Sequence, residues 1–312
     1  MSTTVLVMGS FVADLAFRAA RLPDWGETLM GNSFVLGPGG KGSNQAVAAA
    51  RAGAHVQFLS KLGDDAFGKI ARDLWASDNI DASLVQNCPT PTGAAAILID
   101  AVRGENAIIV VPGACFTLTP SEVEAAAEAI RTAKVFLTQL ELPLDAVERG
   151  LHIARAAGVP TILNPAPAPT TPLPDALIAF ADYLIPNETE ASLLTGLPVD
   201  DIPQAKAAAL ALQARGARNV ILTLGAKGAL VCPPDGTATL VPSLNACPVV
   251  ETTGAGDAFC GGFAAALAEG LPLLQAVRFG CATAAISVTR PGTAPSMPQR
   301  AEINALLATS TS

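Results

Sequence analysis

The sequence predicts an α/β fold in which a doubly wound parallel sheet is accompanied by a second, smaller sheet. Short apolar runs without polar interruption, such as residues 5–8, are typical of parallel strands that are buried on both faces. From Thr119 onward such runs alternate with helical patterns in a regular βα order. Residues 15–36 and a hairpin at residues 93–111 stand outside this order, and they predict the smaller sheet.

The composition supports a large core and disfavours two classes of partner. Half of the 312 residues are hydrophobic and 15% are charged, which is too apolar for a disordered chain. The formal net charge of −8 argues against nucleic acid or an anionic membrane as the main partner. No apolar run reaches transmembrane length and no basic region opens the chain, so we expect no membrane span, no secretory signal and a cytoplasmic location.

The cysteines and histidines exclude several kinds of site. Two histidines, His55 and His152, cannot build a multi-histidine metal centre, and the absence of a G-x-S-x-G segment disfavours a serine hydrolase. No two cysteines form a C-x-x-C pair, so we interpret all six as small core residues in a reducing cytosol. They are Cys88, Cys115, Cys232, Cys247, Cys260 and Cys281.

The first predicted strand, at residues 5–8, ends in a turn without the G-x-G-x-x-G pattern of dinucleotide-binding folds. This absence disfavours a dehydrogenase. Asp14 lies just beyond the strand, at the carboxyl end where open α/β sheets bind ligands. Asp14 is therefore a candidate binding residue, although Asp is also a common turn former.

A glycine-rich loop at residues 37–45 precedes the first predicted helix, for which we expect Ser43 as N-cap and Gly53 as the C-terminal stop. The loop is not a Walker A motif, because it lacks the G-K-[ST] order. Its four glycines in six positions would let a small polyol lie against the backbone, with Lys41 and Asn44 as donors. The alternative is a merely flexible loop.

The next elements are a strand at 55–60, an amphipathic helix at 64–77, and a hairpin with strands at 93–99 and 107–111. We pair the hairpin with the early short strands as a separate sheet. One face of that sheet is apolar, so it would need a cover, either by closing as a lid or by contact with a second subunit.

The regular βα region begins with Thr119 and Glu122, which have the spacing of a capping box. Four strands follow, near residues 135–139, 159–163, 182–185 and 219–223. The carboxyl ends of parallel strands meet at one edge of a sheet, so polar residues after them should gather there. These residues are Glu141, Asn164, Asn187 and Glu190.

A second glycine-rich turn, at residues 251–259, opens a helix that we expect to stop near Gly270. The first turn of such a helix presents N–H groups and the positive end of its dipole, which favour an anion such as phosphate. Asp257 lies in that turn, where a carboxylate could take a proton from a hydroxyl that attacks the bound phosphoryl group. The alternative is that Asp257 is only a favourable first-turn acid.

These motifs resemble the PfkB family of sugar kinases, and within it the ribokinases. The matching segments are residues 39–48, 164–167, 186–190, 223–225 and 253–259. The similarity extends from Val5 to about Leu306. It implies a Rossmann-like sheet of the ribokinase type, formed by one domain over residues 1–312. It also implies a small β-sheet lid with strands at about 12–38 and 93–112.

The resemblance implies ATP-dependent phosphorylation of the primary hydroxyl of a small sugar, with Asp257 as general base. Gly254 would belong to the catalytic turn, in which the backbone N–H groups of Ala255, Gly256 and Asp257 would hold the phosphoryl group. Glu190 would support Mg²⁺ through water. A homodimer through the lid is the expected assembly. The implied sugar-binding residues are Val12, Asp14, Gly39, Gly40, Lys41, Asn44, Ala95, Ile97, Glu141 and Asp257. For ATP they are Asn187, Glu190, Thr223, Gly225, Gly256 and Cys281. For an activating K⁺ they are Glu251, Thr253, Ser287, Arg290, Gly292 and Ser296.

Three positions depart from the ribokinase pattern. Val12 stands where ribokinases have an Asn and where deoxyribokinases of the family carry an apolar residue. Val12 cannot pair with a hydroxyl, which points to an acceptor without one there, such as 2-deoxyribose, or to another sugar. Glu251 replaces an Asp of the K⁺ site, and the longer acid would shift or abolish that site. Cys115 replaces an Asn, without a functional interpretation.

The sequence therefore predicts a sugar kinase with D-ribose as the first-choice acceptor. The same chemistry on 2-deoxyribose, a ketohexose or a nucleoside is the nearest alternative. A catalytically silent sugar-binding or regulatory protein is a rival of another class, against which the presence of Asp257 argues.

Overall fold

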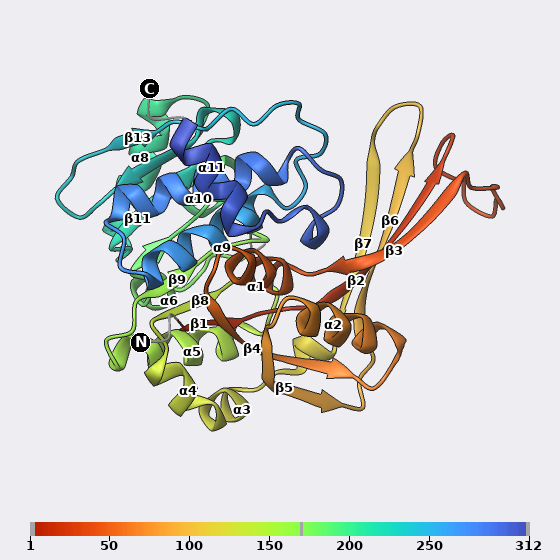
Figure 1. Ribbon diagram of the computed structural model, residues 1–312, viewed down its shortest axis with the longest axis horizontal. Helices are drawn as coiled ribbons and strands as arrows, with labels where there is room; N and C mark the ends of the chain where they lie inside the picture. The colour runs from red at the N-terminus through yellow and green to blue at the C-terminus, as the bar shows by residue number, and fades with distance from the viewer. Residues whose placement is uncertain (1–3, 169–170, 310–312) are drawn as a thin grey trace.

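A computed structural model of the chain describes residues 4–168 and 171–309, and over these residues it contains two sheets (Figure 1). The larger has nine strands in the order β13-β12-β11-β10-β9-β8-β1-β4-β5, and the smaller has four in the order β3-β2-β6-β7. The strands of the larger sheet are β1 (Thr4–Met8), β4 (His55–Gly63), β5 (Asp81–Cys88), β8 (Val135–Thr138), β9 (Thr161–Leu163), β10 (Tyr183–Leu184), β11 (Asn219–Thr223), β12 (Ala229–Cys232) and β13 (Thr239–Val241).

The predicted parallel sheet is confirmed, with additions at its two edges. From β5 to β11 neighbouring strands pair in parallel, whereas β12 and β13 pair antiparallel at one edge. The strand β5 at the other edge was not predicted. Its sequence DASLVQNC mixes polar and apolar residues and is mostly half-buried, so it lacks the continuous apolar run of the inner strands.

Helices cover both faces of the larger sheet. In β1, Val5 and Val7 belong to the core on one face, and Leu6 and Met8 to the core on the other. The first face is covered by α1 (Lys41–Arg51), α2 (Ala66–Ser77), α9 (Ala255–Ala268), α10 (Leu273–Ser287) and α11 (Arg300–Thr309). The second is covered by α3 (Pro120–Ala125), α4 (Ala127–Thr132), α5 (Leu144–Ala156), α6 (Asp175–Ala179), α7 (Glu188–Thr195) and α8 (Ile202–Ala214). Short 3-10 turns are η1 (Ala114–Thr117), η2 (Gly225–Lys227) and η3 (Ala294–Ser296).

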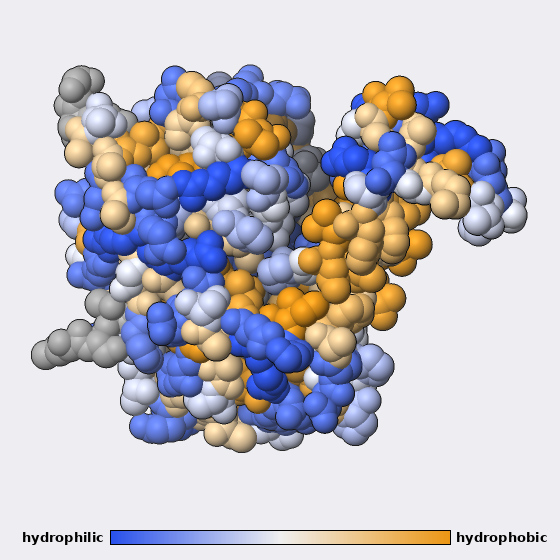
Figure 2. All heavy atoms as spheres, turned by 45° about the vertical axis from the view of Figure 1, so that its right-hand side comes forward, coloured by the Kyte–Doolittle hydropathy of each residue, from blue (hydrophilic) through white to orange (hydrophobic). Residues whose placement is uncertain are grey.

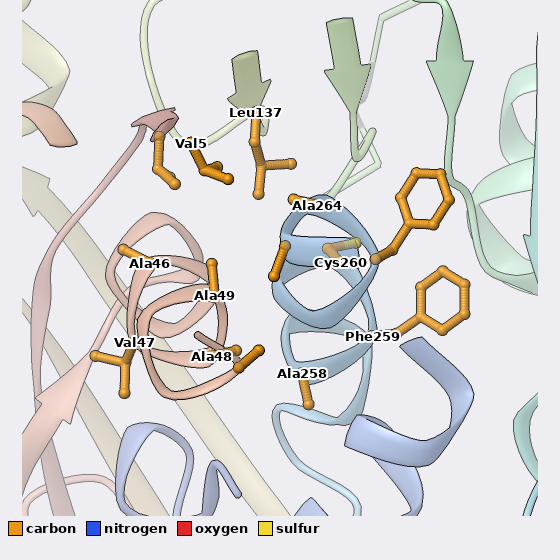
Figure 3. Close-up of a cluster of buried hydrophobic side chains, with 14 of the residues drawn as sticks. Val5, Ala46, Val47, Ala48, Ala49, Leu137, Ala258, Phe259, Cys260 and Ala264 are labelled. Carbon is orange, nitrogen blue, oxygen red and sulfur yellow. The ribbon is translucent and has the colours of Figure 1, made fainter. Parts of the chain in front are cut away.

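The helices α1 and α9 lie side by side and are packed through small residues, among them Ala48 and Ala49 (Figure 3). Their contact is closest at Gly261. A Cβ atom at Gly261 would lie 2.5 Å from Ala48 Cβ and 2.5 Å from the Gln45 carbonyl oxygen. Glycine is therefore required there, and this close approach brings Asn44 and Gln45 of α1 next to Asp257 of α9.

The smaller sheet, called the lid from here on, consists of β2 (Val12–Ala19), β3 (Ser33–Gly39), β6 (Thr92–Asp100) and β7 (Asn106–Gly113). It projects from the main body (Figure 1), and hydrophobic residues spread over its visible surface (Figure 2). The predicted separate sheet is thus confirmed. Its exposed large apolar residues include Phe17, Phe34, Val35, Leu36, Ile108, Ile109, Val110 and Val111.

Two local predictions were wrong. Ser43 is not the N-cap of α1, because the helix begins two residues earlier and Gly40, at φ 86°, is its cap. Ser43 is instead buried, and its Oγ accepts a hydrogen bond from Trp75 Nε1 at 2.9 Å. Cys247 is exposed and thus not a core residue, whereas Cys88 is half-buried.

Other local predictions are confirmed. Thr119 and Glu122 form the capping box of α3, and Gly53 follows the C-cap of α1 with φ 105°. The turn before α9 has Gly254 in the left-handed region at φ 82°, as its place in a glycine-rich turn suggested. Among the described residues, no helix combines the length and the apolar character needed to cross a membrane.

Candidate active site

A polar cavity of about 150 Å³ opens at the carboxyl ends of the central strands, beside the first turns of α1, α7 and α9. It lies where open α/β sheets bind ligands. Three of the four predicted rim residues line it. The lining residues are Lys41, Asn164, Ala166, Ile185, Asn187, Glu190, Thr223, Gly254, Gly256, Asp257 and Cys260.

Asp257 is buried in the first turn of α9, with 6% of its surface exposed. Its Oδ2 accepts from Asn44 Nδ2 at 3.0 Å, and its Oδ1 accepts from Gln45 Nε2 at 2.9 Å. The N–H groups of Gly256 and Asp257 have no acceptor within the helix, because they lie in its first turn. One turn therefore presents a carboxylate and anion-binding N–H groups side by side.

Asn44 has a free acceptor next to Asp257. Its Oδ1 is buried and has no hydrogen-bond partner among the described residues. A buried acceptor without a donor costs free energy, so this oxygen suits a ligand that brings a hydroxyl group.

Asp14, on the lid strand β2, lies close to both Asp257 and Glu141, which is in the turn after β8. Burial, with the charges of Glu141 and Asp257, raises the pKa of Asp14 to about 6. Glu141 Oε2 accepts from the Ser10 hydroxyl and from the Lys41 backbone N–H. A Cβ atom at Gly39 would lie 2.3 Å from Asp14 Oδ2, so a larger residue there would displace the Asp14 carboxylate.

Lys41 supplies a cation among these acids. Burial alone would lower the pKa of Lys41, but the carboxylates of Asp257, Glu141 and Glu190 outweigh it and raise that pKa. The ammonium group thus stays charged and can bind an anionic ligand in the cavity that it lines.

One side of the cavity is formed at α7 and β11. Asn187 and Glu190 make a reciprocal capping box at the start of α7, so the Glu190 carboxylate is held by the Asn187 N–H at 3.0 Å. Burial raises the pKa of Glu190. Thr223 pairs with Asn187 through an isolated parallel bridge. These contacts explain why Asn187, Glu190 and Thr223 lie together.

Two predicted ATP-binding residues lie outside the lining of this cavity. Gly225 is exposed in η2, at φ 51°. Cys281 is buried in the core between helices and sheet, where burial raises the pKa of its thiol to about 12. Cys260, which was predicted only as a core residue, does line the cavity.

The residues predicted for a cation site lie on two neighbouring segments. Glu251 Oε2 accepts from the Gly292 N–H at 2.9 Å, and the Glu251 N–H donates to the Val288 carbonyl oxygen. Ser287 and Ser296 are buried, and Arg290 forms an ion pair with Glu302. Carboxylate, hydroxyl and carbonyl oxygens are the ligands of hard cations.

The lid contributes the predicted residues Val12, Ala95 and Ile97. Val12 and Asp14 point to one face of β2, because side chains alternate along a strand. Ala95 and Ile97 share one face of β6, and Ala95 is the register partner of Asp14. Val12 is 5% exposed and Ala95 is 4% exposed.

Sequence reasoning assigned no role to Ser10, Gln45 and Gln139. Ser10 bonds to Glu141, and Gln45 bonds to Asp257 and accepts from Gln139 Nε2 at 2.6 Å. Gln139 directly follows β8, and Ser10 lies two residues after the end of β1, so the position after a strand end could have identified them.

The raised pKa of Asp14 leads to a prediction about stability. In the unfolded chain this carboxyl ionises near pH 3.8, whereas in the folded protein it ionises near pH 6. The charged form is thus disfavoured by folding, so Asp14 lowers stability as the pH rises through 6. We expect Asp14→Asn to raise the free energy of unfolding by up to about 3 kcal/mol at pH 8.

The gain in the free energy of unfolding from Asp14→Asn should shrink as the pH falls from 6 toward 4. It should be small at pH 4, where the wild-type carboxyl is largely protonated in the folded state. Urea unfolding of both proteins without ligand at the two pH values tests this. A variant that is no more stable than wild type at pH 8 would contradict the assigned environment of Asp14.

Comparisons with known proteins agree with this geometry. A family model described as pfkB family carbohydrate kinase matches residues 2–300. A ribokinase of Haemophilus influenzae is 40% identical over 302 residues, covering 97% of both chains. A deoxyribokinase of Salmonella typhi is 37% identical over 304 residues, covering 97% of this chain and 98% of its own. The structure of Arabidopsis thaliana ribokinase complexed with ribose and ATP matches with a TM-score of 0.94 and 34% identity, covering 98% of this chain and 99% of that chain.

Proposed function

The chain belongs to the pfkB family of carbohydrate kinases and is a ribokinase-like sugar kinase. From that premise we propose that it transfers the γ-phosphoryl group of ATP to the primary hydroxyl of a small sugar, with D-ribose as the leading acceptor. The observation that carries this proposal is Asp257, a buried carboxylate in the same helical turn as free N–H groups. The Arabidopsis relative, which binds ribose and ATP, supports both substrates.

Asp257 is the proposed general base. Its carboxylate takes the proton of the acceptor hydroxyl as the oxygen attacks phosphorus. The Ala255 N–H already donates to the Thr252 carbonyl oxygen, so the free N–H groups of Gly256 and Asp257 are the ones that stabilise the negative charge on the phosphoryl oxygens. Lys41 lines the cavity, and its positive charge attracts the negative phosphoryl oxygens.

ATP lies along the rim of the sheet in this proposal, against Asn187, Thr223 and Gly225. The buried Glu190 carboxylate fits a role in supporting Mg²⁺ through water, since hard oxygen donors suit this ion. When bound, Mg²⁺ neutralises phosphate charge, which a protein of net charge −8 does not do by itself.

The acceptor lies between the lid and the main sheet in this proposal. Asp14, Glu141 and the free oxygen of Asn44 accept from its hydroxyl groups. The glycine-rich loop at Gly39 and Gly40 leaves room for the ring. Ala95 and Ile97 of the lid supply apolar contact to its carbon face.

A second acceptor, 2-deoxyribose, is favoured by Val12. This side chain is apolar and 5% exposed, and it lies two residues from Asp14 on the same face of β2. A hydroxyl group pressed against it would lose its hydrogen bonds to water without a replacement. The similarity to a deoxyribokinase at 37% identity supports the same acceptor.

Replacing Val12 should change the choice between these acceptors. We expect Val12→Asn to raise kcat/KM for ribose relative to 2-deoxyribose by about tenfold or more, because a paired hydroxyl is worth ~1–3 kcal/mol. Val12→Ala, which makes space without a polar group, is the control and should leave the ratio within about threefold. An unchanged ratio in Val12→Asn would mean that this side chain does not touch C2 of the sugar.

K⁺ activation and dimer formation complete the proposal. Glu251 and the loop at residues 290–296 already touch, through the Gly292 N–H, and Thr253, Ser287 and Ser296 add oxygen ligands for a monovalent cation. The exposed apolar residues of the lid support a homodimer, in which a second lid would cover them.

Sugar-dependent ADP release from Mg·ATP tests the function. The panel consists of ribose, 2-deoxyribose, fructose, tagatose and adenosine, each with K⁺ or with Na⁺. We expect turnover with ribose or 2-deoxyribose, and faster turnover with K⁺. Turnover with one of the other acceptors alone would move the function to that substrate. No turnover, together with sugar-dependent thermal stabilisation, would favour a binding protein.

A further inference from the structure

A row of buried amide side chains leads to Asp257. Gln139 Nε2 donates to Gln45 Oε1 at 2.6 Å, and Gln45 Nε2 donates to Asp257 Oδ1 at 2.9 Å and to Asn164 Oδ1 at 3.0 Å. Asn164 Nδ2 in turn donates to the Ile185 carbonyl oxygen at 2.9 Å. None of the four side chains is more than 8% exposed. They come from four separate elements, so only the fold brings them together.

The chemistry of the neighbours dictates how each amide is oriented. The Ile185 carbonyl oxygen can only accept, so Asn164 must turn its NH₂ group toward Ile185 and its oxygen toward Gln45. The ionised carboxylate of Asp257 also can only accept. The end of Gln45 that faces these two acceptors must therefore be its NH₂ group, and its oxygen must face Gln139.

Gln139 is the end of the row farthest from Asp257. By donating to Gln45 Oε1 it stabilises the orientation in which the Gln45 NH₂ group meets Asp257. Gln139 has little room to move, because its Oε1 packs directly against Gly9. A Cβ atom on that glycine would lie only 2.4 Å from this oxygen. That oxygen has no hydrogen-bond partner among the described residues, so no competing bond turns the amide the other way.

We propose that Gln45 and Gln139 are positioning residues for Asp257. Gln45 holds one carboxylate oxygen, Asn44 holds the other, and Gln139 acts only through Gln45. The carboxylate thus stays in one plane, although the neighbouring acids Asp14 and Glu190 would repel it. This inference rests on the proposed function, because it takes Asp257 as the base.

Substitution of the two glutamines by methionine tests the inference, because methionine keeps their length and removes the amide. We expect Gln45→Met to lower kcat about 10- to 100-fold, since it removes a hydrogen bond to a charged group. Gln139→Met should lower kcat by a smaller factor, about 3- to 10-fold, because Gln45 remains but is free to turn. KM for sugar and for ATP should stay within about threefold in both, since neither side chain is proposed to touch a substrate.

A double-mutant cycle separates positioning from general disruption. If Gln139 acts only through Gln45, adding Gln139→Met to Gln45→Met should change kcat by less than about twofold. Ser43→Ala is the matched control. Ser43 is as fully buried on α1 as Gln45, and the substitution removes its hydrogen bond from Trp75. Stability should therefore fall while kcat stays at the wild-type value.

The outcomes distinguish this inference from the function on which it rests. Turnover that survives in Asp257→Asn would overturn the base assignment itself. If Asp257→Asn is inactive while Gln45→Met and Gln139→Met keep wild-type kcat, only the positioning role is refuted. A rise of KM without a fall of kcat, or additive effects in the double variant, also refutes it. If Gln45→Met does not fold, kcat of the milder Gln139→Met decides by the same criteria.

Discussion

Asp257→Asn is expected to lower kcat at least ~10²-fold while sugar and ATP still bind, because general-base assistance typically contributes ~10²–10⁴-fold. The substitution keeps the volume of the side chain and removes its ability to take a proton. The fold should tolerate it, because the Asn44 amide, whose Oδ1 has no partner, can turn to face the new NH₂ group. Steady-state kinetics measure the fall in kcat, and titration of each substrate into the variant measures whether sugar and ATP still bind.

The control for Asp257→Asn is Asp145→Asn. Asp145 is also an acid in the first turn of a helix, α5, but it is exposed, does not line the cavity and belongs to the other helical layer. If Asp257 were only a favourable first-turn acid, both variants would lose a few tenths to about 1 kcal/mol of stability and keep their turnover. Turnover of Asp257→Asn within about tenfold of wild type would refute its role as base.

Gly261→Ala is expected to damage both stability and turnover. The added Cβ atom would lie 2.5 Å from the Gln45 carbonyl oxygen and 2.8 Å from the Ala49 nitrogen, and backbone atoms cannot move aside alone. The helix α1 must therefore shift away from α9, and it carries Asn44 and Gln45 with it. We expect a loss of about 1–3 kcal/mol in the free energy of unfolding. We also expect at least a tenfold fall in kcat, because small displacements at a reacting centre are costly.

Gly262→Ala is the matched control for Gly261→Ala. Its Cβ atom would meet Thr283 Oγ1 at 2.3 Å, on α10, so it overpacks the side of α9 that faces α10 instead of α1. It should lower the melting temperature to a similar degree and keep kcat within about threefold. Equal losses of kcat in the two variants would mean that the contact of α1 with α9 has no special part in placing Asp257.

Much of the central sheet could be predicted from the sequence, because its inner strands are buried on both faces and thus uninterrupted in hydrophobicity. Residues 5–8 show this directly, since alternate side chains enter two different cores. The edge strand β5 could not be predicted in the same way, because it is half-buried and its pattern is mixed. The N-cap of α1 was misplaced because Gly40, in the left-handed region, can begin the helix ahead of Ser43.

The members of the candidate site that lie in recognisable local motifs could be predicted from the sequence. Asp14, Asn44, Glu141 and Asp257 come from four segments, and each segment carried a local signal of its own: a strand end or a glycine-rich turn. The row from Gln139 through Gln45 to Asp257 could not be predicted in this way. Its members are 94 and 212 residues apart in sequence, and only the packing of α1 and β8 against α9 brings them together.

The central claim is transfer of a phosphoryl group from ATP to the primary hydroxyl of a sugar, and the position of the phosphate in the product tests it most directly. The protein is incubated with Mg·ATP, K⁺ and ribose or 2-deoxyribose, and the products are identified by phosphorus and proton NMR. The account predicts ADP together with an equal amount of a sugar phosphate esterified at C5. A phosphate at another carbon, or ADP without a sugar phosphate, would contradict it.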